Sequence, residues 1–254
     1  MNTDSSTTTK VALVTGGTRG IGKATSLALA NAGYRVYAIY ARNRQAAQAL
    51  TDHAQDHGLD IRCLRADLTD EDGRSSCLDT IRSETATVEV IVHCAASGVH
   101  RETTQLTTKQ MAWTFDVNVF SFHSLLLELI PMIPPGGRII GLSSFGATHV
   151  FSSFYAAVGS SKGALESLFR HYARVLAPRG IAVNIVCPGM VATDAIEAFP
   201  DKESQMQSTI EITPTGKLAT PEDVAGVVLF FASSDAAGQI IGQTINVDGG
   251  RSLY

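Results

Sequence analysis

The sequence contains no run of about 18 uninterrupted apolar residues, the length that a membrane-spanning helix requires. Its opening residues, 1–10, are mainly polar and include no apolar signal segment. We therefore expect a cytoplasmic protein with no membrane partner. A basic surplus is also lacking, because the net charge is −4 and the pI is near 6.0. A nucleic-acid partner is therefore not expected.

Cysteine is scarce, and no pair has the C-x-x-C spacing of a redox or metal motif. Three of the four cysteines lie in apolar, strand-like runs, where a reduced thiol packs as a small hydrophobic group. The seven histidines include no H-x-x-x-H pair beside carboxylates. The sequence therefore predicts neither a disulfide nor a metal site.

Short apolar runs alternate with amphipathic segments along almost the whole chain. The apolar runs predict seven strands, at residues 11–15, 35–40, 61–65, 88–94, 138–143, 181–187 and 244–247. The amphipathic segments predict helices near 20–32, 43–57, 70–84, 107–130, 154–177 and 221–233. This alternation is typical of an α/β fold with a doubly wound parallel seven-stranded sheet, the Rossmann architecture.

The size of the chain favours a single domain. It has 254 residues, of which 44% are hydrophobic, enough to fill a sheet that is covered on both faces. We expect a flexible N-terminus at 1–9 and one domain at 10–254. Residues 190–217 form a long connection of mixed polarity after a predicted strand, and they are expected to be a substrate lid. A mobile insertion without function is the alternative.

A glycine-rich turn follows the first predicted strand. Residues 13–22 read Leu-Val-Thr-Gly-Gly-Thr-Arg-Gly-Ile-Gly, which places Gly16, Gly20 and Gly22 in a T-G-x-x-x-G-I-G frame before a helix. Glycines here let the backbone turn tightly and approach a pyrophosphate at the helix N-terminus. The motif predicts a cofactor with two phosphates, although three glycines near a strand end also occur in ordinary turns.

This spacing resembles the fingerprint of the short-chain dehydrogenase/reductase family, and the resemblance extends over nearly the whole chain. It implies a nicotinamide cofactor held by the glycines together with Thr18, Arg19 and Ile21. In the same family, an acid at the end of the second strand selects NAD, because a carboxylate there repels an added 2′-phosphate. Here Tyr40 stands at that position and Arg42 follows.

Two positively charged side chains are therefore expected near the added 2′-phosphate of the cofactor. Arg42 can bind a phosphate with two charge-assisted hydrogen bonds, and Arg19 offers a second positive group. NADPH is the expected cofactor. In the alternative interpretation, Arg42 and Arg44 are only a solvated helix start.

The resemblance assigns further cofactor contacts. It implies that Asp67 and Leu68 bind the adenine ring, although Asp67 could instead be a helix N-cap, a role that better suits Thr69. The stretch 93–98, His-Cys-Ala-Ala-Ser-Gly, departs from the family's usual Asn-Asn-Ala-Gly, but small residues such as Ala95 still let the backbone pass the cofactor. Residues expected near the nicotinamide carboxamide are Pro188, Gly189, Val191 and Thr193.

A reductase also needs a proton donor aimed at the oxygen that becomes negative. Tyrosine suits this task when a lysine cation lowers its pKa from its usual value near 10. Most family members carry Tyr-x-x-x-Lys, but here Val158 lies four residues before Lys162, and the nearest tyrosine is Tyr155. Seven residues span nearly two helical turns of about 3.6 residues each, so Tyr155 is expected at or before the first turn of its helix.

The Tyr-x6-Lys spacing is similar to that of enoyl-acyl carrier protein reductases, and most of all to the type called enoyl-acyl carrier protein reductase III. The segments Cys94-Ala-Ala-Ser-Gly-Val99 and Thr213-Pro-Thr-Gly-Lys217 are also similar. The resemblance implies hydride transfer from NADPH to the β-carbon of an enoyl thioester while Tyr155 acts on the enolate oxygen. Lys162 is expected to bind the nicotinamide ribose and to lower the pKa of Tyr155.

Ser144 matches the family's catalytic serine, and Asn118 matches the asparagine that supports a water-linked path near the lysine. Both are included in the expected catalytic set, although each could be an ordinary hydrogen-bonding group. In the alternative interpretation, Tyr155 packs beside Phe151 and Phe154, and Lys162 is a solvated helix residue.

Two other functions stay open. One is a ketoreductase of the same family, because the turn at 188–193 follows the general family pattern. The other is a catalytically silent NADP-binding scaffold or sensor, against which the presence of the four expected catalytic residues argues. Expected partners are a small-molecule or carrier-protein-linked acyl substrate and, by resemblance, further copies in a homotetramer built from dimers. Arg170, Arg174 and Arg179 could bind an acidic carrier or could simply be solvated.

Overall fold

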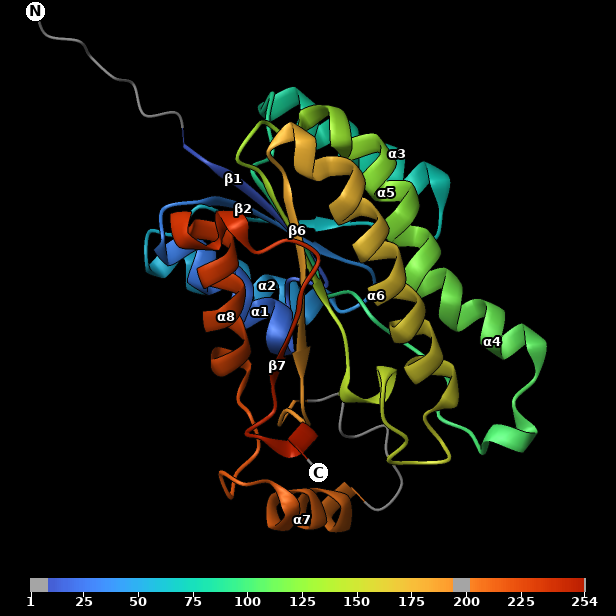
Figure 1. Cartoon of the computed structure of the whole chain (residues 1–254). Coiled ribbons are helices and arrows are strands. Elements are labelled where there is room, and N and C mark those ends of the chain that lie inside the picture. The colour runs from blue at the N-terminus through green and yellow to red at the C-terminus, as the bar shows by residue number, and fades with distance from the viewer. Residues whose placement is uncertain (1–8, 194–201, 254) are drawn as a thin grey trace, which may run out of the picture.

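The computed structural model describes residues 9–193 and 202–253 (Figure 1). The expected flexible N-terminus, except for its last residue, and residues 194–201 of the expected lid lie outside the described residues. Within the described ranges, no helix has the length and apolar character needed to cross a bilayer. All four cysteines are free thiols.

The seven strands form one parallel sheet in the order β3-β2-β1-β4-β5-β6-β7, which confirms the predicted architecture. The strands are β1 (Val11–Thr15), β2 (Arg35–Tyr40), β3 (Ile61–Arg65), β4 (Val90–His93), β5 (Arg138–Leu142), β6 (Ala182–Pro188) and β7 (Thr244–Val247). Every residue of β1, β4 and β6 is buried. Such continuous apolar strands form because helices cover both faces of a parallel sheet.

Two layers of helices enclose the sheet (Figure 1). One layer holds α1 (Gly20–Asn31), α2 (Arg44–Asp56) and α8 (Pro221–Ser233), and the other holds α3 (Glu71–Glu84), α4 (Thr108–Phe115), α5 (Ser121–Leu129) and α6 (Ala156–Leu176). Successive residues of a strand pack in two different hydrophobic clusters, one on each face of the sheet. Leu13 packs in the cluster that includes Phe122 and Phe169, whereas Val14 packs in the cluster that includes Phe231. This alternation is the normal consequence of the strand pleat.

Two segments differ from the sequence prediction. The single helix expected near 107–130 is divided into α4, a π-helical turn at Asp116–Phe120 and α5. The expected lid contains a helix, α7 (Lys202–Ile212), which lies beyond the carboxyl ends of the strands (Figure 1). The start of α8 agrees with the sequence, because Thr220 and Asp223 form a reciprocal capping box.

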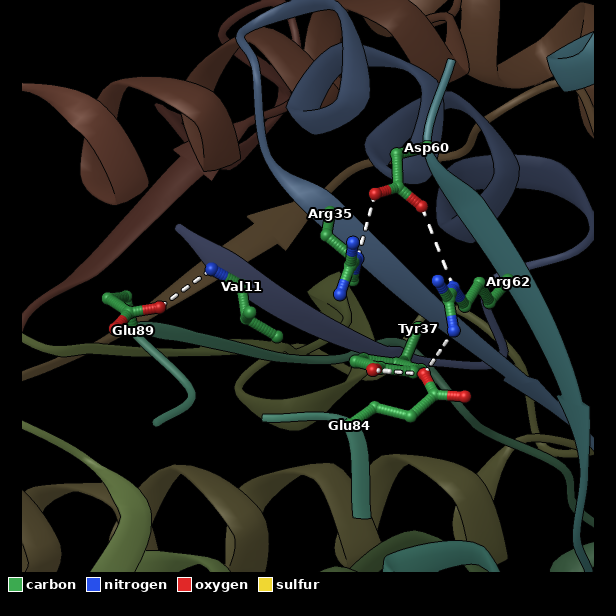
Figure 2. A network of polar contacts seen from close by, with 7 residues as sticks. All are labelled: Val11, Arg35, Tyr37, Asp60, Arg62, Glu84 and Glu89. Carbon is green, nitrogen blue, oxygen red and sulfur yellow. Dashed lines mark hydrogen bonds and ion pairs between the residues drawn. The ribbon is translucent and has the colours of Figure 1, made fainter. Parts of the chain in front are cut away.

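The amino end of the sheet carries a network of charged side chains (Figure 2). Asp60 pairs with Arg35 at 2.7 Å and with Arg62 at 3.7 Å, and Arg62 also pairs with Glu84 at the end of α3. Glu84 accepts a hydrogen bond from the buried Tyr37 hydroxyl at 2.6 Å. Burial and this carboxylate raise the pKa of Tyr37 to about 12. The network joins strands β2 and β3 to α3.

Candidate active site

The glycine turn lies against the carboxyl end of β4. Gly16 has a φ of +66°, and a Cβ added there would lie 2.9 Å from the Ala95 Cα. A Cβ added to Gly22 would lie 2.1 Å from the Gly16 carbonyl oxygen. At Gly20 the nearest group to such an atom is the Thr193 methyl, at 3.3 Å. The structure therefore brings five of the expected cofactor residues together, and at Gly16 and Gly22 it leaves no room for a side chain.

The N-terminus of α1 is arranged to receive an anion. Its N-cap residue, Arg19, has an extended backbone, and the Arg19 side chain makes no capping hydrogen bond. The first turn contains no acidic residue, and Thr18, just before it, is buried. The first N–H groups of a helix have no partners within the helix, and its dipole favours negative charge there. Together with the tight glycine turn, this terminus fits the pyrophosphate of a dinucleotide.

The ends of β2 and β3 form the expected adenosine side. The two strands pair with Tyr40 opposite Arg65, and the Ala66 amide donates to the Tyr40 carbonyl at 2.9 Å. Arg42 and Asp67 each lie two residues beyond this last pair, and both are exposed. No acid stands at the end of β2 to repel a 2′-phosphate.

The alternative that Asp67 or Thr69 is the N-cap of the following helix was wrong. The N-cap of α3 is Asp70, whose carboxylate accepts from the Gly73 amide at 2.8 Å, and not Thr69. The Asp67 carboxylate accepts from the amide and the hydroxyl of Thr69 at 3.1 and 2.7 Å. Leu68, beside it, is buried. Asp67 is therefore fixed in a local turn just outside the helix.

Tyr155 is the residue immediately before α6, as its spacing from Lys162 predicts. The loop from β5 places Ser144 beside it, with 3.1 Å between the Ser144 Oγ and the Tyr155 hydroxyl. The phenol ring lies on Gly146, where an added Cβ would be 2.5 Å from the ring. The position four residues before Lys162 is occupied by the buried Val158. The phenol therefore stands at the start of the helix and not inside its first turn.

Lys162 is buried on the inner face of α6, with 3% of its surface exposed. Its Nζ donates to the Leu142 carbonyl at the end of β5 at 2.7 Å. Burial lowers the pKa of Lys162 to about 8, and Cys94, Cys187 and Glu166 partly oppose that shift. The ammonium is thus held at the carboxyl end of β5, where Leu142 lies two residues before the serine that contacts the phenol.

The expected lowering of the tyrosine pKa was wrong for this structure. Burial raises the pKa of Tyr155, Cys187 adds to the rise, and the hydrogen bond between Tyr155 and Ser144 opposes it. The physical reason is that an apolar, buried site penalises the phenolate. At neutral pH the group is therefore a protonated phenol, which is the form that can donate.

A buried network that the sequence did not predict holds Asn118. His93 is fully buried, with its Nδ1 2.8 Å from the Thr15 Oγ and its Nε2 3.2 Å from the Asn118 carbonyl. Because a carbonyl only accepts, Nε2 must carry the proton and Nδ1 must accept from the Thr15 hydroxyl. That hydroxyl oxygen in turn accepts from the Ala95 amide at 3.1 Å. Burial and the nearby Lys162 lower the pKa of His93 to about 3, so the ring stays neutral.

The Asn118 side chain completes the network from inside the π-helical turn. Its Oδ1 accepts from the Ser97 amide and its Nδ2 donates to the Ser161 Oγ, both at 2.9 Å. Ser161 precedes Lys162, so this turn is tied to the lysine's own helix segment. A sequence signal for His93 existed: it is a histidine inside an otherwise apolar strand, where a buried polar group needs partners.

A second residue missed by the sequence lies one turn beyond the lysine. Glu166 is buried and accepts a hydrogen bond from the Ser143 hydroxyl. Ser143 and Ser144 are consecutive, so one serine fixes the end of β5 to α6 while the next meets the phenol. Glu166 therefore helps to fix the loop that carries Ser144.

The expected nicotinamide side follows β6. The Gly189 amide donates to the Val247 carbonyl at 3.0 Å, and Val191 forms a bridge with Ala219. Pro188 is the last residue of β6, and Thr193 lies beside the glycine turn. These contacts place the segment over the same edge of the sheet as the glycine turn. Among the described residues, no group of three or more His, Cys, Asp or Glu side chains could hold a metal ion.

Comparisons with known proteins extend over the same residues. The sequence pattern described as Enoyl-(Acyl carrier protein) reductase matches residues 16–252. A 1-cyclohexenylcarbonyl-CoA reductase from Streptomyces collinus is 30% identical, over 96% of this chain and 87% of that relative. A 3-oxoacyl-(acyl-carrier-protein) reductase from Synechocystis sp. is 33% identical, over 97% and 98%. A solved short-chain dehydrogenase/reductase from Serratia marcescens has a TM-score of 0.88 at 31% identity, covering 96% of this chain and 98% of that one.

Proposed function

This chain belongs to the short-chain dehydrogenase/reductase family, and from that premise we propose that it is an NADPH-dependent reductase of an activated carbon–carbon double bond in an acyl thioester. One observation carries the proposal: the phenol of Tyr155 stands before the first turn of α6, while Val158 takes the place four residues before Lys162. In an enoyl thioester the β-carbon accepts hydride, whereas charge develops on the more distant carbonyl oxygen. A proton donor set back along the helix suits that separation.

NADPH, when bound, supplies the hydride that the β-carbon accepts. The chain's own residues handle the proton. Tyr155, kept protonated by burial, donates from its hydroxyl to the enolate oxygen, and Ser144 orients that hydroxyl through their hydrogen bond. The resulting enol tautomerises to the saturated thioester, so the substrate gains one hydride and one proton. Lys162 is proposed to bind the nicotinamide ribose and to place a positive charge beside the reacting centre.

The preference for NADPH is proposed from the charges near the end of β2. Arg42 is exposed there, Arg19 precedes α1, and no acid occupies the position of Tyr40. Arg42→Asp should lower kcat/KM for NADPH relative to NADH by about 10- to 100-fold, because one charge-assisted hydrogen-bonding group is lost. Arg44→Asp, at the start of α2, is the matched control and should change the ratio little. Equal effects of both variants would show that only general charge matters.

A ketoreductase is the second candidate, because one relative is named a 3-oxoacyl reductase. The same Ser144 and Tyr155 pair could protonate the alkoxide of a reduced ketone. Purified protein with NADPH should oxidise the cofactor with a crotonyl thioester. Oxidation with the acetoacetyl thioester alone would overturn the enoyl proposal in favour of the ketoreductase. Turnover of neither substrate, with NADPH binding intact, would favour a silent scaffold.

We also propose a homotetramer. An exposed apolar strip on the α4 to α5 face supports it, since Trp113, Phe120 and Leu127 are 38%, 54% and 54% exposed. Large apolar side chains in this density mark a surface that another protein covers. Light scattering should give four times the chain mass of 26.9 kDa, and a monomer would contradict this proposal.

The acyl substrate is proposed to be carried as a thioester on a carrier protein or a smaller thiol.

A further inference from the structure

A connected set of rings surrounds the Tyr155 phenol. The Phe151 ring lies 4.8 Å from the Tyr155 ring and 6.2 Å from Phe145, measured between centroids. The His100 ring lies 5.7 Å from the Tyr155 ring. Phe145 also stacks on His149 at 4.3 Å. We call these five residues, His100, Phe145, His149, Phe151 and Tyr155, the aromatic belt.

The belt is held in place by contacts between two loops. The loop after β4 and the loop after β5 are joined by hydrogen bonds from the Thr103 hydroxyl to the Ser153 carbonyl at 2.6 Å and from the Ser153 hydroxyl to Glu102 at 2.7 Å. The Arg251 guanidinium lies over the Phe145 ring at 5.1 Å from its centroid. Such cross-links fix the rings relative to the phenol, so the belt is preorganised.

The belt also includes a partly exposed phenylalanine. Phe151 is 38% exposed although its ring contacts both Tyr155 and Phe145, and the next aromatic along the loop, Phe154, is 36% exposed. The Phe151 and His100 rings lie beside the phenol, whereas the aliphatic side chain of Val150, on the same loop as Phe151, is 96% exposed.

We propose that the acyl substrate carries a planar aromatic ring conjugated to its double bond, as in an arylacryloyl thioester, and that Phe151 is a specificity-determining residue for it. A flat conjugated ring can make offset or edge-to-face contacts with the belt while its acceptor oxygen meets Tyr155. A saturated ring or chain of equal area gains only its hydrophobic burial. The inference rests on the proposed function, since it names the substrate class of that same site.

Three thioesters of N-acetylcysteamine separate aromatic recognition from size. Crotonyl is small, 3-cyclohexylacryloyl has a ring of similar size but puckered, and cinnamoyl has the flat ring. An aromatic pair contributes about a 2- to 12-fold advantage beyond burial. We expect kcat/KM with NADPH to be highest for cinnamoyl, about 3- to 10-fold above 3-cyclohexylacryloyl. Equal values for the two rings would overturn the inference.

Variants test the role of Phe151. Phe151→Leu keeps an apolar side chain but removes the ring, and it should abolish most of the cinnamoyl preference while kcat/KM for 3-cyclohexylacryloyl changes less than about twofold. Phe230→Leu is the matched control, because Phe230 is 43% exposed on α8 and lies outside the belt. A cinnamoyl preference that survives in Phe151→Leu would contradict the assignment of this residue.

A binding measurement keeps this inference separate from the reaction itself. The saturated thioesters 3-phenylpropionyl and 3-cyclohexylpropionyl can be titrated calorimetrically into protein with NADP⁺. Tighter binding of the phenyl compound without turnover of any enoyl thioester would support the belt and contradict the proposed function. Turnover of all three enoyl thioesters, with no preference in rate or binding for the phenyl ring, would support the function and overturn the inference.

Discussion

The two ends of the same sheet hold their polar side chains in opposite ways. At the amino end, Arg35, Asp60, Arg62 and Glu84 pair as full charges that remain partly exposed, with 42% of the Asp60 side chain and 41% of Arg62 accessible (Figure 2). At the carboxyl end, polar groups such as Lys162 and His93 are almost completely buried, and their pKa values are lowered.

The difference indicates what each end does. Exposed ion pairs keep ordinary hydration and contribute little, typically 0–1 kcal/mol each. Buried groups lose hydration, so their protonation states depend on each partner, and such perturbed groups gather where chemistry is performed. We therefore expect matched changes at the two ends to differ in kind: activity should respond at the carboxyl end, and only stability at the amino end.

The largest contrast is expected for Lys162→Met against Arg62→Met. Methionine has a similar length to lysine but brings no charge, so it removes the ammonium from the candidate site. Removing this positive charge from beside the reacting centre should lower kcat by about 10²- to 10³-fold, the range for the loss of one electrostatic stabiliser. Steady-state rates at saturating NADPH check this, with circular dichroism to confirm folding. A reduction of similar size in Arg62→Met would break the comparison between the two ends.

The next contrast concerns stability. His93→Phe keeps an aromatic ring over Phe122 but leaves the Asn118 carbonyl and the Thr15 hydroxyl without their partner. Each buried unsatisfied group costs about 1–3 kcal/mol, so we expect the free energy of unfolding in urea to fall by about 2–4 kcal/mol. Tyr37→Phe removes one hydrogen bond at the amino end and should cost about 1 kcal/mol. Equal losses in the free energy of unfolding would show that the buried network contributes no more to stability than the hydrogen bond of Tyr37.

The pH dependence should also come from the carboxyl end. The pKa of Lys162 is lowered from 10.5 to about 8, so its ammonium is lost as the pH rises through about 8. We expect kcat to fall above that pH, about tenfold per pH unit, and the small residual rate of Lys162→Met to lack this decline. The contribution of Lys162 to stability should change with pH in the opposite direction to kcat. Between about pH 8 and 10.5 the unfolded lysine binds more protons than the folded one, so its contribution to the free energy of unfolding rises with pH.

The smallest effect is expected for Arg62→Ala. This side chain is 41% exposed in its pairs with Asp60 and Glu84. The free energy of unfolding should fall by less than about 1 kcal/mol, and less still at high salt, because screening weakens exposed pairs. Urea titrations at low and high ionic strength measure it. A larger loss of stability that does not depend on salt would contradict the comparison, because the charged pairs at the amino end would then behave like the buried groups at the carboxyl end.

Most of the fold could be predicted because its signals are local. Apolar runs marked each strand to within two residues, and the amphipathic segment near 221–233 marked α8. The helix α7 gave no such signal, because none of its described side chains is buried and its apolar residues therefore follow no packing period. The π-helical turn at Asp116–Phe120 was also missed, since its irregularity depends on the contacts of Asn118 with other segments.

The candidate site was predictable where one segment contains the pattern. The count from Tyr155 to Lys162 was enough to place the phenol before α6. His93 and Glu166 could not be found in this way, because their partners lie 78 and 23 residues away in the chain. The direction of the Tyr155 pKa shift was missed for the same reason: it depends on burial by distant segments and not on the spacing to one lysine.

The account depends most on the phenol of Tyr155, and Tyr155→Phe tests it directly. This variant removes one hydroxyl while keeping the ring on Gly146, and Tyr172→Phe, on the same helix, removes a hydroxyl that contacts His123 instead. Turnover of an enoyl thioester with NADPH should fall by about 10³-fold in Tyr155→Phe, with unchanged affinity for NADPH and with Tyr172→Phe nearly as active as the original protein. Full turnover in Tyr155→Phe would contradict the account.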